Sequence, residues 1–194
     1  SMEGCQARDI EARVSAVVDS FSAALGWGES SAPRALTLTT MAAQALCELA
    51  PVLPPSLAPT IFSMATLLSD QAWREAVLPY MSRHSREFWS VRFGKLEANA
   101  LTPVTNLIDR MRSSPTVAAL LGSPRSTYDV RRAMDRGQVV LWSLGGTGAW
   151  ARLVSCFVTH DLFRAAMSRR TLAPRRRRPF YAWIDELQRI SGTG

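Results

Sequence analysis

The sequence predicts a mostly α-helical chain in which an all-helical domain is followed by a βαβ piece. Three observations lead to this fold class. Apolar residues recur at helical spacing through about the first two-thirds of the 194 residues. Proline, glycine and short polar residues separate these stretches, as they do at helix ends. Further along, two short apolar runs at 139–142 and 180–184 enclose one more helical stretch, which is the order of a βαβ unit.

The first two expected helices are long. Apolar residues recur at three- and four-residue spacing over about 6–25, and Gly26 follows them, which predicts a helix that ends there. A second helix is expected over roughly 33–50, beginning at a proline. The proline-rich stretch 51–59 that follows is expected to be a stiff connector.

Shorter helices are expected in the rest of the first two-thirds. Asp70 is a suitable N-cap residue for a helix that follows it. Aromatic and aliphatic residues from Phe88 to Leu96 trace one apolar stripe. Two polar residues that are each followed by proline, Thr102 and Ser114, mark helix starts. We therefore expect helices over 61–68, 71–83 and 85–101, and two more that begin at 102 and 114.

The pattern changes after Ser126. Ser126 and Asp129 have the capping-box spacing and open one more helix, which Gly137 closes. Two buried strands, 139–142 and 180–184, are then joined by a helix over about 150–168. Such strands are parallel and their crossover is right-handed. The expected divisions are an N-terminal helix and linker over 1–35, an all-helical domain over 36–137 and the βαβ segment over 138–194.

Composition indicates a polyanionic partner and a reducing compartment. The chain carries 23 basic and 16 acidic residues, a net charge of +7. Residues 1–97 have a net charge of −2 and residues 98–194 one of +9, so the second half is the candidate for a polyanion. The three cysteines form no CxxC clamp, which indicates the cytoplasm. Prolines interrupt the most apolar stretch, so no membrane span is expected.

Two adjacent carboxylates form the clearest chemical pattern. Asp185 and Glu186 follow directly after the apolar run 180–184. Ligands gather at the carboxyl ends of parallel strands, where a Walker B element supplies an aspartate for the Mg²⁺ shell. The next residue would polarise an attacking water. Many buried strands also end in an acidic pair that only starts the next loop, so both interpretations stay open.

A glycine-rich turn fits the spacing of a dinucleotide-binding fingerprint. Gly146, Gly148 and Ala151 stand where GxGxxG/A requires them. In that fingerprint an acidic residue follows about 20 residues later. Asp185, however, lies 39 residues after Gly146. A tight strand-to-helix turn is therefore the favoured interpretation, and a dinucleotide-binding fragment is the weaker alternative.

Four consecutive arginines form the densest cationic cluster. Arg175, Arg176, Arg177 and Arg178 lie between two prolines, just before the run 180–184. Such a cluster neutralises phosphates and makes nucleic-acid binding depend on salt. A solvated loop is an equally good interpretation, because no aromatic residues alternate with these arginines to form a base-stacking platform.

The order of several short motifs resembles that of a known family. The matching stretches are Thr66–Asp70, Trp73–Arg74, Phe88–Trp89, Pro103–Leu107, Asp129–Arg131, Gly137–Leu144 and Arg178–Glu186. On their order and spacing, the chain from about residue 60 to 190 resembles the conjugative DNA-transfer coupling ATPases of type IV secretion systems. These are the TraG/TraD-like branch of the FtsK/HerA superfamily of motors.

The resemblance implies a fold and an activity. In this family an all-helical domain is inserted between the Walker A and Walker B strands of a P-loop (RecA-like) ATPase core. Asp185 would then serve Mg²⁺ through water and Glu186 would activate water, with ATP and Mg²⁺ as cofactors of the full-length protein. DNA, single- or double-stranded, and secretion-system or relaxosome proteins would be partners. The full-length protein would be a cytoplasmic hexamer whose helical domain recognises substrates or partners.

One motif of the family is missing from the sequence. No GxxxxGK[ST] is present, and the only lysine, Lys95, lies in an expected helix. We therefore expect a segment of an ATP-driven DNA-translocating motor that does not hydrolyse ATP alone. A non-catalytic DNA- or protein-binding helical module is the alternative.

Overall fold

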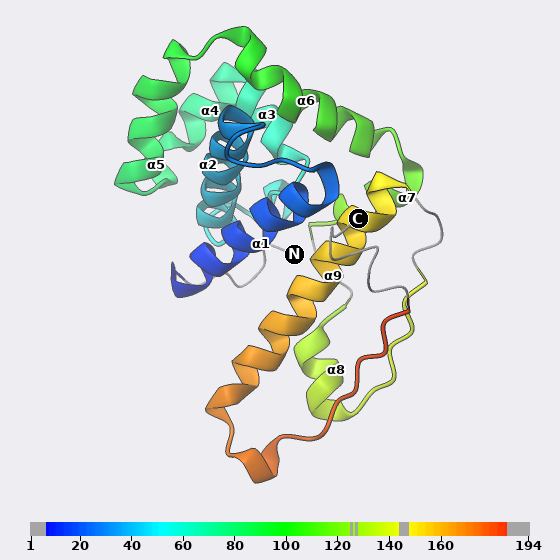
Figure 1. The fold of residues 1–194 in the computed structure, drawn as a ribbon. Helices are drawn as coiled ribbons and strands as arrows, with labels where there is room; N and C mark the ends of the chain where they lie inside the picture. Colours follow the sequence, from blue (N-terminus) through cyan, green and yellow to red (C-terminus); the bar gives the residue numbers. More distant parts are fainter. Residues whose placement is uncertain (1–6, 125, 127, 144–147, 186–194) are drawn as a thin grey trace. The chain divides into compact units, whose positions relative to one another are not determined.

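The computed structural model describes residues 7–124, 126, 128–143 and 148–185, and these residues are mostly helical (Figure 1). Within these ranges there are nine α-helices and no β-strand. The chain divides into two compact units, described separately below. Unit 1 comprises Ser1–Asp19 and Trp27–Ser126, and unit 2 comprises Ser20–Gly26 and Thr127–Gly194. The domain limits expected at 35 and 137 stay predictions.

Most helices of unit 1 lie where the sequence predicts them. The helices are most of α1 (Ala7–Leu25), then α2 (Pro33–Leu49), α3 (Ser63–Ser69), α4 (Gln71–Val77), α5 (Arg83–Glu87), α6 (Ala98–Arg112) and α7 (Pro115–Leu121). The helix start expected at Thr102 is wrong, because Pro103 lies inside a helix that begins at Ala98, and the helix expected over 71–83 ends at Val77. The expected cap of α4 is confirmed, because the Asp70 carboxylate accepts a hydrogen bond from the Trp73 backbone N–H at 2.9 Å. The all-helical part of the predicted fold class is therefore confirmed.

Helix α2 is the centre of unit 1. It contacts α3, α5 and α6, and 11 of its 17 residues are buried. The small side chains of Ala42 and Ala43 have no exposed surface, which allows neighbouring helices to approach closely. From α6, Val104 and Ile108 lie one turn apart on the buried face. The core of unit 1 is thus a layer of helices packed around one nearly enclosed helix.

The helix expected over 85–101 is interrupted in the structure. After α5 the chain forms a π-helical turn (Phe88–Arg92), then a 3-10 turn (Phe93–Lys95), and becomes extended at Leu96 and Glu97. In the π turn the Phe93 N–H donates to the Phe88 carbonyl, so residues five apart share a side. Both rings can then be buried beside Trp89, whose ring centroid lies 4.9 Å from that of Phe93.

In the described residues unit 2 contains the end of α1 and two whole helices, α8 (Val130–Arg136) and α9 (Ala149–Ser168), which pack against each other. Its hydrophobic cluster consists of Val130, Met134 and Ala165, with Tyr128, Leu162 and Phe180 packed against it. The N-cap of α8 is Asp129, and the helix ends at Gly137, whose φ of 64° is left-handed. Two 3-10 turns, Arg169–Thr171 and Pro174–Arg176, follow α9.

The two strands of the expected βαβ piece are not seen. Figure 1 draws both apolar runs as irregular segments that begin near the end of α8 and run in the same direction. No backbone hydrogen bond joins 139–143 to 180–185, the described parts that would form the ladder. Instead, Val139, Leu141, Tyr181 and Trp183 are 77–92% exposed. A strand needs a hydrogen-bonded neighbour, and these segments have none in the described chain.

Candidate functional site

Asp185 is the one residue of the expected catalytic pair that the structure describes. It stands in a turn at the end of 180–184, and its side chain is exposed. Glu186, the expected water-activating residue, lies outside the described residues. No group of three or more potential metal ligands exists in the described part of the chain. One carboxylate fits a single, water-mediated contact to Mg²⁺, but these residues alone do not form a site for ATP and Mg²⁺.

The start of the segment that leads to Asp185 is firmly held. Arg178 donates a hydrogen bond from Nη1 to the carbonyl of Arg136, the last residue of α8, at 3.2 Å. Its guanidinium lies so close to Gly137 that a Cβ atom there would overlap it. A cation at a helix C-terminus also interacts favourably with the helix dipole. Two residues further on, Phe180 packs against the hydrophobic cluster of unit 2.

A buried arginine joins this segment to α8 and α9. Arg169, which is 7% exposed, donates through Nη2 to the carbonyl of Arg178. Its Nε lies 3.1 Å from one carboxylate oxygen of Asp135 in α8. Arg131 holds the other oxygen at 2.6 Å and also donates to the Ser168 hydroxyl of α9. We call Arg131, Asp135, Arg169 and Arg178 the arginine network, and it ties the segment 178–185 to α8 and α9.

The four consecutive arginines divide into two pairs. Arg178 belongs to the arginine network, and Arg177 donates to the carbonyls of Leu172 and Arg170 at 2.8 and 3.0 Å. Both guanidinium groups are therefore used to shape the loop. Arg175 and Arg176 are exposed, and their guanidinium groups have no partner in the described part of the chain. Only this second pair is available to a phosphate without a local hydrogen bond being broken.

The net positive charge of the chain belongs to one unit. Unit 1 holds 11 basic and 11 acidic residues, a net charge of zero. Unit 2 holds 12 basic and 5 acidic residues, a net charge of +7. Long-range attraction of a polyanion is therefore a property of unit 2.

The glycine-rich turn is described only at its end. Gly146 lies outside the described residues, and Gly148 is the N-cap of α9 with an extended backbone. A Cβ atom on Gly148 would meet nothing within 4 Å. The second glycine of a dinucleotide fingerprint is needed for close backbone approach to the ligand. The described residues around Gly148 therefore leave room for a side chain at this position.

No family model, no curated protein and no solved structure matches this chain. Among the described helices, none combines the length and apolar character that a bilayer crossing requires.

The arginine network is the main feature that the sequence reasoning missed. One part of it carries a sequence signal, because Arg131 and Asp135 are four residues apart on a helix, the spacing of an ion pair. The contacts of Arg169 and Arg178 carry none. Their acceptors are largely backbone carbonyls, which any residue type supplies.

Proposed function

We propose that the chain is a segment of an ATP-driven DNA-translocating motor of the conjugative coupling type. In this proposal unit 1 recognises a substrate or partner protein, and unit 2 contributes to the motor core and to DNA contact. ATP and Mg²⁺ would bind only in the full-length protein, which would supply the phosphate-binding loop. The segment 180–186 would be the Walker B strand, with Asp185 toward Mg²⁺ and Glu186 toward the attacking water.

One observation carries the proposal. The runs 139–142 and 180–184 start together at the end of α8, are connected by α9, and expose large apolar side chains. Burying each such side chain would stabilise a protein by about 1.5–3 kcal/mol, so a cover for both runs is expected. Further strands, between or beside these runs, would bury them in a parallel sheet and put Asp185 at its carboxyl edge.

The charge of unit 2 supports DNA as the polyanion. Arg175 and Arg176 stand on the loop just before the proposed Walker B strand, and their exposed guanidinium groups have no partner among the described residues. DNA contact at this loop would couple the position of the strand to the position of the nucleic acid.

The decisive test is ATP hydrolysis by the full-length protein, with and without DNA, beside its Glu186→Gln variant. DNA-stimulated turnover is expected, and it should be lost in the variant while ATP still binds, because the amide cannot accept the proton of the attacking water. Turnover that the variant retains, or that the full-length protein never shows, would refute the motor proposal.

The second candidate is a non-catalytic DNA-binding module, which the available Arg175 and Arg176 favour. Binding of a fluorescent DNA duplex by this chain is measured over a range of salt concentrations. Replacing both arginines with glutamine should lower the slope of log K against log salt by about 0.9 for each lost phosphate contact. Replacing Arg83 and Lys95 with glutamine, an equal change of charge at two exposed positions of unit 1, should leave the slope unchanged. Equal slopes in all three proteins would exclude this loop from DNA binding.

A further inference from the structure

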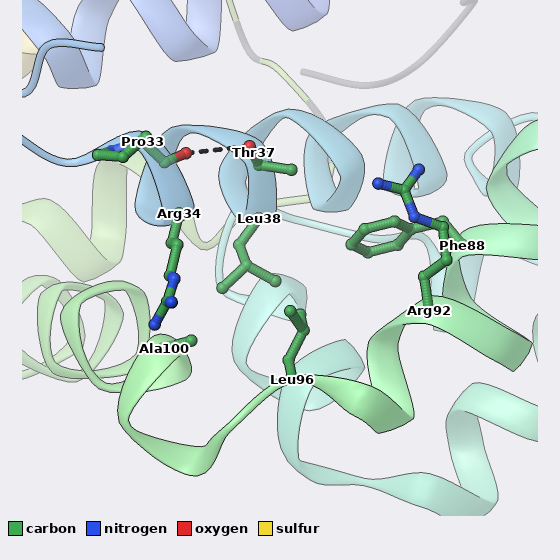
Figure 2. Close-up of a pocket in the computed structure, with 8 residues that line it drawn as sticks. All are labelled: Pro33, Arg34, Thr37, Leu38, Phe88, Arg92, Leu96 and Ala100. Carbon is green, nitrogen blue, oxygen red and sulfur yellow. Dashed lines mark hydrogen bonds between the residues drawn. The ribbon is translucent and has the colours of Figure 1, made fainter. Parts of the chain in front are cut away.

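A groove of about 220 Å³ lies in unit 1 between α2 and the chain from the π turn to the first residues of α6 (Figure 2). Its floor is apolar. Leu38 of α2 and Leu96 point toward one another across it, with Phe88 on one side and Ala100 on the other. Leu38, Phe88 and Ala100 belong to the packed core, whereas Leu96 is 37% exposed. The floor is therefore preformed and partly open to solvent.

The groove has a guanidinium group toward each end. Arg34 extends from α2 past Ala100, and Arg92 extends from the π turn beside Phe88 (Figure 2). Among the described residues that line the groove, none is acidic. Arg34 has only a loose contact with Glu97, at 3.9 Å between two side chains about 70% exposed, and such pairs contribute little. Both cations are therefore able to bind an anionic group that enters the groove.

The π turn makes Phe88 and Arg92 part of the same groove wall. The ring of Phe88 is 3% exposed, and the guanidinium carbon of Arg92 lies 5.6 Å from its centroid. Stacking on the ring fixes the direction of the Arg92 side chain and reduces the freedom that it would lose on binding. π turns within helices frequently occur at functional positions.

We propose that this groove docks a short acidic segment of a partner protein, in which one apolar side chain is flanked by carboxylates. The apolar side chain would lie against Leu38 and Leu96, and the carboxylates would accept hydrogen bonds from Arg34 and Arg92. Unit 1 has no net charge, so a long polyanion gains nothing from it beyond these two cations. The proposal names the chemistry of the partner that unit 1 is proposed to recognise, and it rests on that part of the proposed function alone.

The test measures the binding of a fluorescein-labelled peptide, Gly-Asp-Glu-Leu-Asp-Glu-Gly, to the 194-residue chain by fluorescence anisotropy. Binding is expected to weaken about tenfold in Arg34→Gln and in Arg92→Gln, through loss of one charge-assisted hydrogen bond each. Thr37→Trp, at an exposed position on the groove rim, should abolish binding by filling the groove. Arg83→Gln, away from the groove, is the control for charge, and circular dichroism confirms that each variant is folded.

Three results of the peptide measurement would overturn the proposal. They are the absence of binding at millimolar peptide, equal binding by the groove variants and the unchanged chain, and equal binding of a peptide whose acidic residues are replaced by asparagine and glutamine. A single-stranded oligonucleotide that binds and depends on Arg34 and Arg92 would make the groove a nucleic-acid site instead. No nucleotide or DNA is needed for the peptide measurement, so its failure is distinct from failure of the ATPase test.

Discussion

Replacing Gly137 with alanine is expected to destabilise unit 2 by about 2–3 kcal/mol. Gly137 has a φ of 64°, and an L-residue in this left-handed conformation costs about 1–2 kcal/mol. The new Cβ would also overlap the Arg178 guanidinium. Because that group ends a flexible side chain, it can move away, and the cost is the loss of its contact with the C-terminus of α8. For an exposed cation this contact is worth about 1 kcal/mol.

Gly26 provides a matched control for the backbone part of this cost. Its φ is 68°, but an added Cβ atom there would meet nothing within 4 Å. Gly26→Ala should therefore cost only the left-handed conformation, about 1–2 kcal/mol. A double-mutant cycle isolates the remainder. In an Arg178→Ala background, Gly137→Ala should cost about 1 kcal/mol less than it does in the unchanged chain.

The assay is equilibrium unfolding in urea, followed by far-ultraviolet circular dichroism, for the unchanged chain and these variants. Native-state hydrogen exchange of the α8 amides reports the same free energies locally. The predicted contribution of the Arg178 contact is refuted if Gly137→Ala destabilises the protein no more than Gly26→Ala does. It is equally refuted if the cycle through Arg178 gives a coupling energy of zero.

Two further predictions concern unit 2. Asp135→Asn should lower the unfolding free energy by about 2 kcal/mol in thermal denaturation, because the buried guanidinium of Arg169 loses its anionic partner, whereas Asp185→Asn should change it little. Equal melting curves for the two variants would contradict this. Burial, and next the charge of Asp161, raise the pKa of Tyr128 from 10.0 to about 12. Between pH 10 and pH 12 the Tyr128 phenol therefore keeps its proton in the folded chain and loses it in the unfolded chain. The stability that Tyr128 contributes is complete below pH 10 and is lost as the pH rises toward 12. Tyr128→Phe should remove that loss when urea unfolding is compared at about pH 9 and about pH 11, and an unchanged loss would show that other groups cause it.

The helices could be predicted from the sequence where local signals agree. The spacing of apolar residues and the glycine after them placed the helix over 6–25, which α1 (Ala7–Leu25) confirms. The N-cap role of Asp70 was visible because a carboxylate competes well for the free N–H groups of a first turn. Ser126 was the wrong N-cap residue for α8. Asp129 also precedes the apolar run, and its carboxylate accepts the hydrogen bond from the Arg132 backbone N–H.

Tertiary contacts decided the features that the sequence could not predict. The apolar stripe from Phe88 to Leu96 indicated one helix, but packing of Phe88, Trp89 and Phe93 favours a π turn and then an extended residue pair. The strands at 139–142 and 180–184 were predicted from their apolar character. Apolar residues indicate that a segment is buried, but they do not indicate which neighbouring strand completes its hydrogen-bonded ladder.

The sequence predicted which residues cluster at the candidate site, but it could not predict what each of them contacts. The arginine cluster at 175–178 was evident, but its division into a structural pair and an available pair depends on which backbone carbonyls lie nearby. The groove beside α2 joins residues about 60 positions apart, from Arg34 to Arg92, and no local pattern relates them.

The arginine network gives unit 2 a mechanical property. Arg178 begins the segment that ends at Asp185, and its guanidinium rests on the last turn of α8 while its carbonyl is held by Arg169. A displacement of this segment along its length must therefore carry α8 with it or break a charged hydrogen bond. A lysine at position 178 would keep the charge but offer a point contact where the planar guanidinium lies against Gly137. The stiffness of the segment 178–185 therefore depends on the planar shape of the Arg178 guanidinium as well as on its charge.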